Sequence, residues 1–276
     1  MVLSIAGFDP TGGAGILADS RTVNRFGLHC IALITCQTSQ NSKGFYSIKT
    51  TPISLLNDQF CRILEDYTIS AIKIGLVTNL ETLNFIVSIL STSLKSIPVV
   101  VDPIISATKS VRLINERFLT TFKKELIPLA SVLTPNIAEL KTLVGKEFTD
   151  KKEIERAAML AVLLGPKYVA VTGINLQSLA NKSNVKDLLT DGNELTYFNH
   201  ARVNSHNSHG SGCIYSSSIA SNLALGKSIY QSTDIAGRYL HHLLKGSDDY
   251  EFLSKSGRMN SYGPLLNNKN ISTNSN

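Results

Sequence analysis

The 276-residue sequence has no tryptophan, and its four cysteines, Cys30, Cys36, Cys61 and Cys213, form no Cys-x-x-Cys pair. This scarcity argues against a disulfide framework and against a cysteine-rich zinc module. No apolar run is long enough to span a bilayer, and no basic segment precedes an apolar stretch at the start of the chain. We therefore expect a cytoplasmic protein without a membrane partner. All its cysteines except Cys213 are expected to pack as core residues.

Charged residues are also few, at 17% of the chain, with a net charge of +6 and a pI near 9.1. The positive charges are scattered, because Lys123-Lys124 and Lys151-Lys152 are each followed by a glutamate. No basic stripe forms, so we expect a solvated surface and no nucleic-acid partner, with nucleotide phosphates as the alternative reason for the excess of positive charge.

Short apolar runs alternate with helical patterns over the first 175 residues. Strands that are apolar on both faces predict an α/β protein with a mostly parallel sheet covered by helices on two sides. The expected strands are 2–6, 30–36, 71–74, 97–101, 131–134 and 168–172, and the expected helices are 14–26, 53–67, 80–94, 116–126, 136–144 and 152–164.

The remainder of the chain has a different pattern. Strand-like segments 187–190 and 194–198 flank Asp191-Gly192-Asn193, which is typical of a small antiparallel hairpin. Two long helices are expected at 213–225 and 229–244. We predict one domain over residues 1–265 and a polar, disordered tail over 266–276.

Polar residues follow the apolar runs at the points where the predicted strands end. Ligands bind outside the carboxyl ends of the strands in open parallel sheets, so we expect these residues to converge on one crevice. They are Gly7, Asp9, Gln40, Asn41, Lys73, Gly75, Asp102, Asn136, Glu139, Thr172 and Gly173.

Two glycine-rich segments stand at predicted helix starts. The first, Gly7 to Gly15, lacks both the Walker A and the Gly-x-Gly-x-x-Gly spacing, so it is either a ligand loop or a plain glycine turn. The second places Gly210, Ser211 and Gly212 before a helix of small residues. Backbone N–H groups and the helix dipole form an anion site there, as a phosphoryl group in transfer requires.

Cys213 begins that helix and lies in the same field. A helix N-terminus can lower the pKa of a thiol toward about 7, which would let Cys213 act as a base. Core packing is the alternative. A zinc site with His206 and His209 is a third possibility, although no fourth ligand is evident.

Asn136 and Glu139 are three residues apart at another helix start, and Asp102 ends a strand. A carboxylate and an amide on one face suit a hydrated Mg²⁺. The same pair also fits a capping box, in which Asn136 caps the helix and Glu139 completes the exchange. Both interpretations can hold together.

Several segments together resemble the hydroxymethylpyrimidine/phosphomethylpyrimidine kinases of thiamine biosynthesis. The matches run in order along the chain and are specific as a set. They are 5–19, Ser39-Gln40-Asn41-Ser42, Lys73-Ile74-Gly75-Leu76, Val101-Asp102-Pro103, 133–139, His209-Gly210-Ser211-Gly212-Cys213 and the terminal Gly263-Pro264-Leu265.

The resemblance implies a ribokinase-like fold and a kinase that uses ATP and Mg²⁺, usually as a homodimer. Its substrates would be 4-amino-5-hydroxymethyl-2-methylpyrimidine and then the monophosphate. It also implies roles for individual residues. Cys213 would be the catalytic base, beside Gly210, Ser211 and Gly212. Gln40 would bind the edge of the pyrimidine ring, with Gly7, Asp19 and Leu76 lining the same pocket. Mg-ATP would be bound by Asp102, Asn136, Glu139 and Thr172, with Asp102 and Glu139 holding the metal through water.

The chain departs from the family at two places. Cys36-Gln37 replaces residues that are usually more apolar, and Thr172-Gly173-Ile174-Asn175 stands where the family usually has Lys-Gly-Gly-His, so a lysine that contacts phosphate is missing. The second departure leaves open a degenerate protein that binds a pyrimidine or nucleotide without turnover. A pyridoxal kinase is the other alternative, since related chains accept pyridoxal in the same pocket.

Overall fold

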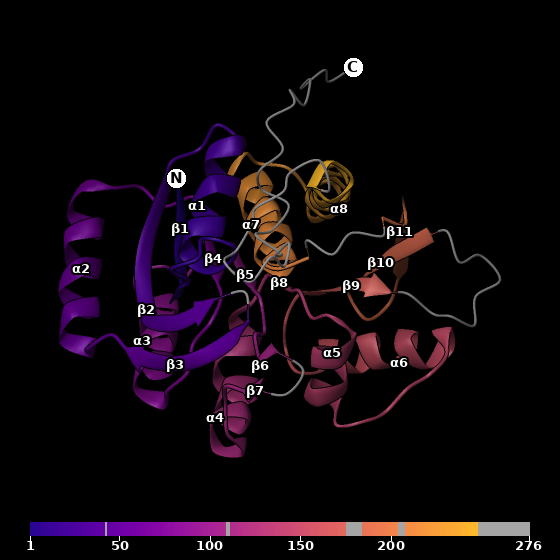
Figure 1. Cartoon of the computed structure of the whole chain (residues 1–276), viewed down its shortest axis with the longest axis horizontal. Helices are drawn as coiled ribbons and strands as arrows, with labels where there is room; N and C mark the ends of the chain where they lie inside the picture. Colours follow the sequence, from indigo (N-terminus) through magenta and orange to yellow (C-terminus); the bar gives the residue numbers. More distant parts are fainter. Residues whose placement is uncertain (42, 109–110, 175–183, 204–207, 248–276) are drawn as a thin grey trace.

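The fold is a three-layer α/β sandwich, seen here in a computed structural model that describes the chain except for residues 42, 109–110, 175–183, 204–207 and 248–276 (Figure 1). Nine strands form one central sheet. Helices α1, α7 and α8 cover one face of it, and the helices from α2 to α6 lie on the other side. The predicted arrangement of a mostly parallel sheet between two helical layers is therefore confirmed.

The sheet has the strand order β11-β10-β9-β8-β5-β4-β1-β2-β3. Its six central strands, from β9 to β2 in that order, are parallel, and antiparallel strands extend it at both edges. The strands are β1 (Val2–Phe8), β2 (Cys30–Asn41), β3 (Gly44–Thr50), β4 (Ala71–Ile74), β5 (Val99–Val101), β8 (Val132–Leu133), β9 (Tyr168–Ile174), β10 (Asn184–Thr190) and β11 (Leu195–Ala201).

Alternating residues of the central strands fill two separate apolar cores. Val2 and Ala71 belong to the core under α1, α7 and α8, whereas their neighbours Leu3 and Ile72 belong to the larger core on the opposite face. These residues are fully buried, which is why the strands read as continuous apolar runs rather than as alternating ones.

Helix boundaries follow local capping chemistry. Asn79 accepts a hydrogen bond from the Thr82 N–H at the start of α3, and capping boxes at Asn136 and Asp150 begin α5 and α6. The helices are α1 (Gly15–Arg25), α2 (Ile53–Asp66), α3 (Leu80–Ser91), α4 (Glu116–Thr121), α5 (Ile137–Val144), α6 (Lys151–Val162), α7 (Ser211–Ala224) and α8 (Ile229–Ser247). Helix α4 continues as a π-helical turn, Phe122–Leu126, and a short 3₁₀ turn, Ile127–Leu129, where the sequence predicted one α-helix over 116–126.

The antiparallel elements were predicted only in part. The hairpin of β10 and β11 is confirmed, with Thr190 opposite Leu195 beside the turn. The extension of β2 to Asn41, its partner β3, and the small ribbon of β6 (Ser106–Thr108) with β7 (Val111–Arg112) were not predicted. The predicted tail, 266–276, and the Gly263–Leu265 segment lie outside the described residues.

Two further expectations concern membranes and cysteines. Within the described part of the chain, no helix is both long and apolar enough to cross a membrane. Cys36 is buried and Cys30 is half-buried, but Cys61 is exposed on α2, so its interpretation as a core residue is wrong. Cys61 lies on the solvent face of an amphipathic helix that buries Leu56 and Phe60.

Candidate active site

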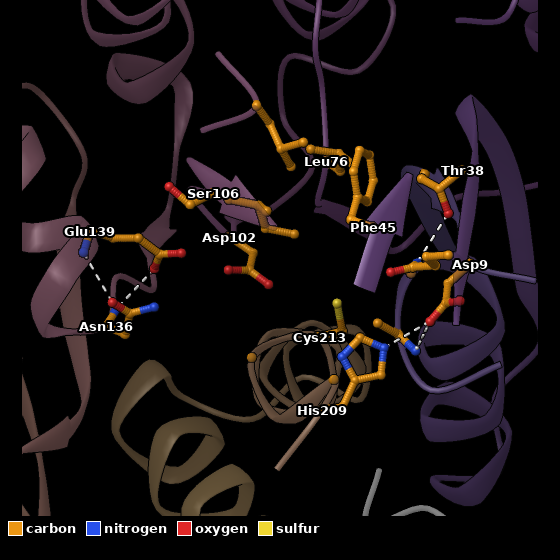
Figure 2. Close-up of a pocket in the computed structure, with 18 of the residues that line it drawn as sticks. Asp9, Thr38, Phe45, Leu76, Asp102, Ser106, Asn136, Glu139, His209 and Cys213 are labelled. Atoms are coloured by element: carbon orange, nitrogen blue, oxygen red, sulfur yellow. Dashed lines mark hydrogen bonds and ion pairs between the residues drawn. The ribbon is translucent and has the colours of Figure 1, made fainter. Parts of the chain in front are cut away.

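One cavity opens at the carboxyl ends of the parallel strands, where α7 begins (Figure 2). Of the residues singled out from the sequence, it is lined by Gly7, Asp9, Gln40, Leu76, Asp102, Asn136, Glu139, Thr172, Gly210, Gly212 and Cys213. Segments that are up to two hundred residues apart in the chain therefore meet at one place. The strand ends therefore converge as expected, but four of the residues predicted to share the crevice do not line it: Asn41, Lys73, Gly75 and Gly173.

Asp9 organises the first glycine loop. Its carboxylate accepts hydrogen bonds from the backbone N–H groups of Thr11 and Ala14, at 2.9 and 3.0 Å, and from the Thr11 hydroxyl at 2.8 Å. Burial raises the pKa of Asp9, but hydrogen bonds from His209 and Thr11 outweigh it and hold the pKa below its ordinary value. An anionic Asp9 thus fixes the turn that leads into α1.

The second glycine loop packs directly on the first. His209 Nε2 lies 2.9 Å from the Asp9 carboxylate, and Gly210 approaches Gly13 so closely that a Cβ on Gly210 would lie 1.9 Å from the Gly13 carbonyl oxygen. Gly210 has φ of +78° and caps α7. Both loops were identified in the sequence, but the contact between them was not predicted.

Cys213 lies in the first turn of α7 and lines the cavity, although it is only 5% exposed. Burial raises the pKa of its thiol to about 12; Asp19 and Asp102 add to the increase, while Lys73 and a hydrogen bond from the Gly15 backbone oppose it. The expectation that the helix N-terminus brings this pKa toward 7 is therefore wrong for the ligand-free protein, because desolvation outweighs the favourable charges. Cys213 is therefore both packed in the protein interior and part of the cavity wall.

Carboxylates form the opposite wall of the cavity. Asp102 is buried at the end of β5, and Glu139 lies in the first turn of α5, where it completes the predicted capping box with Asn136 at 2.9 and 3.0 Å. Burial raises the pKa of both carboxyl groups, and the negative charge of Asp102 raises that of Glu139 further. Two carboxylates that repel each other beside an open cavity are an unfavourable arrangement without a cation.

This donor set fits Mg²⁺ better than a transition metal. The described residues contain no cluster of three or more histidine, cysteine, aspartate or glutamate side chains that could enclose an ion. Mg²⁺ is commonly held by one or two carboxylates together with waters and substrate phosphates. His206, part of the zinc alternative, lies outside the described residues, and His209 is paired with Asp9.

A less polar pocket occupies the other end of the cavity. Gln40 Nε2 donates to the Thr38 hydroxyl at 3.0 Å, which in turn donates to the Phe8 carbonyl, so the amide of Gln40 is held in one orientation. Leu76 and Phe45 line the same end. Phe45 was missed because its strand, β3, was not predicted. In Figure 2, Cys213 lies between Asp102 on one side and Phe45 and Thr38 on the other.

Asp19, Ser211 and Thr172 were predicted to be site residues, but only Thr172 lines the cavity. Asp19 was expected to line the pocket, but its carboxylate has no solvent exposure, forms an ion pair with Lys73 and is not among the lining residues. Asp19 lies on the face of α1 that packs on the sheet. Ser211 also does not line the cavity, so it can contribute only through its backbone N–H. Thr172 does line it.

Comparisons with known proteins agree with this geometry. The family described as phosphomethylpyrimidine kinase matches residues 9–260. A hydroxymethylpyrimidine/phosphomethylpyrimidine kinase of Rhizobium meliloti is 33% identical, with 91% of this chain and 92% of the relative covered. The crystal structure of a Clostridium difficile phosphomethylpyrimidine kinase superposes with a TM-score of 0.76 at 31% identity, covering 88% of this chain and 99% of that one.

A Staphylococcus aureus pyridoxal kinase in complex with AMP-PCP and pyridoxal superposes with a TM-score of 0.79 at 24% identity, covering 89% of this chain and 87% of that one. At this identity the likeness concerns the fold alone. The ribokinase-like fold predicted from the sequence is confirmed by these structures.

Proposed function

The chain belongs to the phosphomethylpyrimidine kinase family, and we propose that it transfers the γ-phosphoryl group of ATP to 4-amino-5-hydroxymethyl-2-methylpyrimidine and then to the resulting monophosphate. The observation that carries this proposal is the order of groups along the cavity. A half-apolar pocket with a fixed amide, an N-terminal helix turn bearing Cys213, and a carboxylate wall follow one another. This is the order that an acceptor, a transferring phosphoryl group and a metal-nucleotide require.

The acceptor binds at the half-apolar end in this proposal. Phe45 and Leu76 offer apolar contacts to a pyrimidine ring. The Gln40 amide, oriented by Thr38, can pair through its carbonyl oxygen and second N–H with the exocyclic amine and a ring nitrogen. The ring position would direct the hydroxymethyl group toward Cys213.

The nucleotide phosphates lie between the start of α7 and the carboxylate wall. The backbone N–H groups of Gly210, Ser211 and Gly212 are suited to the transferred group, because the N-terminus of a helix favours anions. Asp102 and Glu139 would hold Mg²⁺ through water, with Asn136 and Thr172 beside them. When bound, Mg²⁺ supplies positive charge that offsets the phosphate oxygens.

Cationic side chains are scarce in this cavity. Among the described residues that line it, His209 is the only basic one. Among the described lining residues, the helix N-terminus is therefore the main group suited to stabilise the phosphates. Since Thr172 replaces the family lysine, we propose that the second phosphorylation, whose acceptor is itself a phosphate, is the weaker step.

Cys213 is proposed as the group that takes the proton of the acceptor hydroxyl. Its raised pKa keeps the thiol protonated at neutral pH without ligands. Asp19 and Asp102 are the carboxylates that raise it, but Asp19 is already paired with Lys73, whereas Asp102 faces the cavity. Burial is the largest cause of the raised pKa, and pairing of Asp102 with a cation would remove a smaller one, so it would shift the pKa of Cys213 downward.

Family membership also bears on the domain organisation, location and partners of the protein. We propose that residues 1–265 act as one domain, that the protein is cytoplasmic and homodimeric, and that neither nucleic acid nor a membrane is a partner. The single sheet that runs through the described residues supports the first of these proposals.

An assay of ADP release tests the proposed function. The pyrimidine alcohol, its monophosphate and pyridoxal are compared as acceptors with Mg-ATP. We expect the alcohol to give the largest kcat/KM and the monophosphate a smaller one. A larger kcat/KM with pyridoxal would favour a pyridoxal kinase, and no ADP release despite binding of the pyrimidine would favour a non-catalytic protein.

A further inference from the structure

A fully buried ion pair lies beneath the active-site cavity. Lys73 Nζ of β4 is 2.9 Å from both carboxylate oxygens of Asp19 on α1, and neither side chain is exposed. The hydroxyls of Ser4 and Ser217 donate to the same carboxylate at 2.6 and 2.8 Å. Asp19 therefore joins four elements: α1, β1, β4 and α7.

The ammonium group of this pair lies close to the reacting groups. A Cβ on Gly75 would be 2.7 Å from Lys73 Nζ, and the next residue, Leu76, lines the cavity. Burial lowers the pKa of Lys73, but the negative charge of Asp19, its hydrogen bonds and the charge of Asp102 outweigh this effect and raise the pKa above its ordinary value. Lys73 is thus a permanent positive charge below the site.

The hydroxyl of Ser217 bonds outside α7, unlike that of the next residue, Ser218. Ser216, Ser217 and Ser218 are all fully buried in α7. The Ser216 hydroxyl donates to the Gly212 carbonyl at 2.8 Å and also to the Asp102 carboxylate, at 3.3 Å. The Ser218 hydroxyl donates to the Ile214 carbonyl, four residues earlier in the same helix, at 2.7 Å. Ser217 instead donates to Asp19 on another helix. Because Ser217 follows Cys213 by one helical turn, this bond anchors the segment that carries the thiol.

Stability alone does not account for the ion pair. Removing two charges from water offsets most of their mutual attraction, and apolar side chains of similar volume often stabilise a core equally well. Apolar side chains cannot, however, accept a hydrogen bond from Ser217 or place a positive charge below Cys213.

We propose that the Lys73–Asp19 pair is a positioning element for catalysis, which holds Cys213 in its reactive place by anchoring α7 through Ser217. This inference rests on the proposed kinase reaction, in which Cys213 accepts the substrate proton. Neither Lys73 nor Asp19 lines the cavity, so we expect their effect to fall on kcat rather than on KM.

Ser217→Ala tests the anchor, and Ser218→Ala is its matched control, since both remove a buried hydroxyl from adjacent positions of α7. Both are made in a Cys61→Ser background, because Cys61 is exposed and would react with thiol reagents. For Ser217→Ala we expect kcat to fall about three- to tenfold, as the loss of one hydrogen bond implies, with both KM values unchanged. The rate of Cys213 alkylation by iodoacetamide at fixed pH should fall as well. Ser218→Ala should leave kcat and alkylation unchanged.

Replacement of the charges separates positioning from stability. Lys73→Met leaves the Asp19 charge buried without its partner and should lower the Tm. Lys73→Met/Asp19→Leu removes both charges, and we expect it to recover the Tm while kcat stays at least about tenfold below that of the native protein. Native kcat and alkylation rate in this double variant, or in Ser217→Ala, would overturn the proposal. If the native protein shows no turnover, the proposed function fails, but the alkylation rates still decide whether the pair positions Cys213.

Discussion

Replacement of Gly210 by alanine should disable the site through a movement of about 1 Å. A Cβ on Gly210 would lie 1.9 Å from the Gly13 carbonyl oxygen, and real Cβ contacts are essentially never below 3.0 Å. The two glycine loops must therefore separate by about 1 Å or more. A displacement of this size between reacting groups can lower kcat roughly a hundredfold. The φ of +78° adds a strain of about 1–2 kcal/mol.

Gly226 offers a matched control at the other end of α7. It also has φ of +78°, just after the C-terminal end of α7, but a Cβ there meets no atom within 4 Å. Gly226→Ala should therefore share the loss of stability and retain its activity. Thermal unfolding and steady-state ADP release measure the two effects. Equal kcat in the two variants would refute the claim that close packing of the glycine loops sets the geometry of the anion site.

Three further predictions address the wall residues of the cavity. Cys213→Ala should lower kcat by about 10²–10⁴-fold in the ADP assay while pyrimidine binding, measured by calorimetry, persists. Gln40→Leu should weaken pyrimidine binding and leave ATP affinity intact; parallel loss of both would point to misfolding. The raised pKa of Glu139 means that the folded protein holds an extra proton above pH 4.5, so the free energy of unfolding of the ligand-free protein should fall as the pH rises from 5 to 8. Glu139→Gln, which keeps the capping box, should flatten that slope in denaturant titrations; an unchanged slope would contradict it.

The parallel core of the fold could be predicted because its strands are buried on both faces and its helices have clear periodicity. The edge strands could not. No residue of β3 is fully buried, and Gln40 and Asn41 at the end of β2 read as a polar loop. Their pairing depends on a partner strand rather than on local burial, which sequence patterns do not reveal.

The candidate site was predictable as a set of strand ends and glycine loops, and its details were not. Asp19 lies in a segment that matches the family, yet which face of α1 it occupies depends on how that helix packs against β4 and α7. The pKa of Cys213 was expected to fall on the basis of the helix N-terminus alone, because burial and the surrounding carboxylates are products of the tertiary structure. Lys73 could be recognised in the sequence as a lysine inside an apolar strand. Its role could not be predicted, because the sequence does not show that it pairs with Asp19.

Phosphorylation of a pyrimidine in this cavity, with Cys213 as the proton acceptor, can be followed by time-resolved ³¹P NMR. The native protein and Cys213→Ala are each incubated with Mg-ATP and the pyrimidine alcohol. We expect the native protein to form the pyrimidine monophosphate first and the diphosphate more slowly, and Cys213→Ala to form neither at a comparable rate. A native spectrum without any phosphorylated pyrimidine, or equal rates for the two proteins, would contradict this expectation.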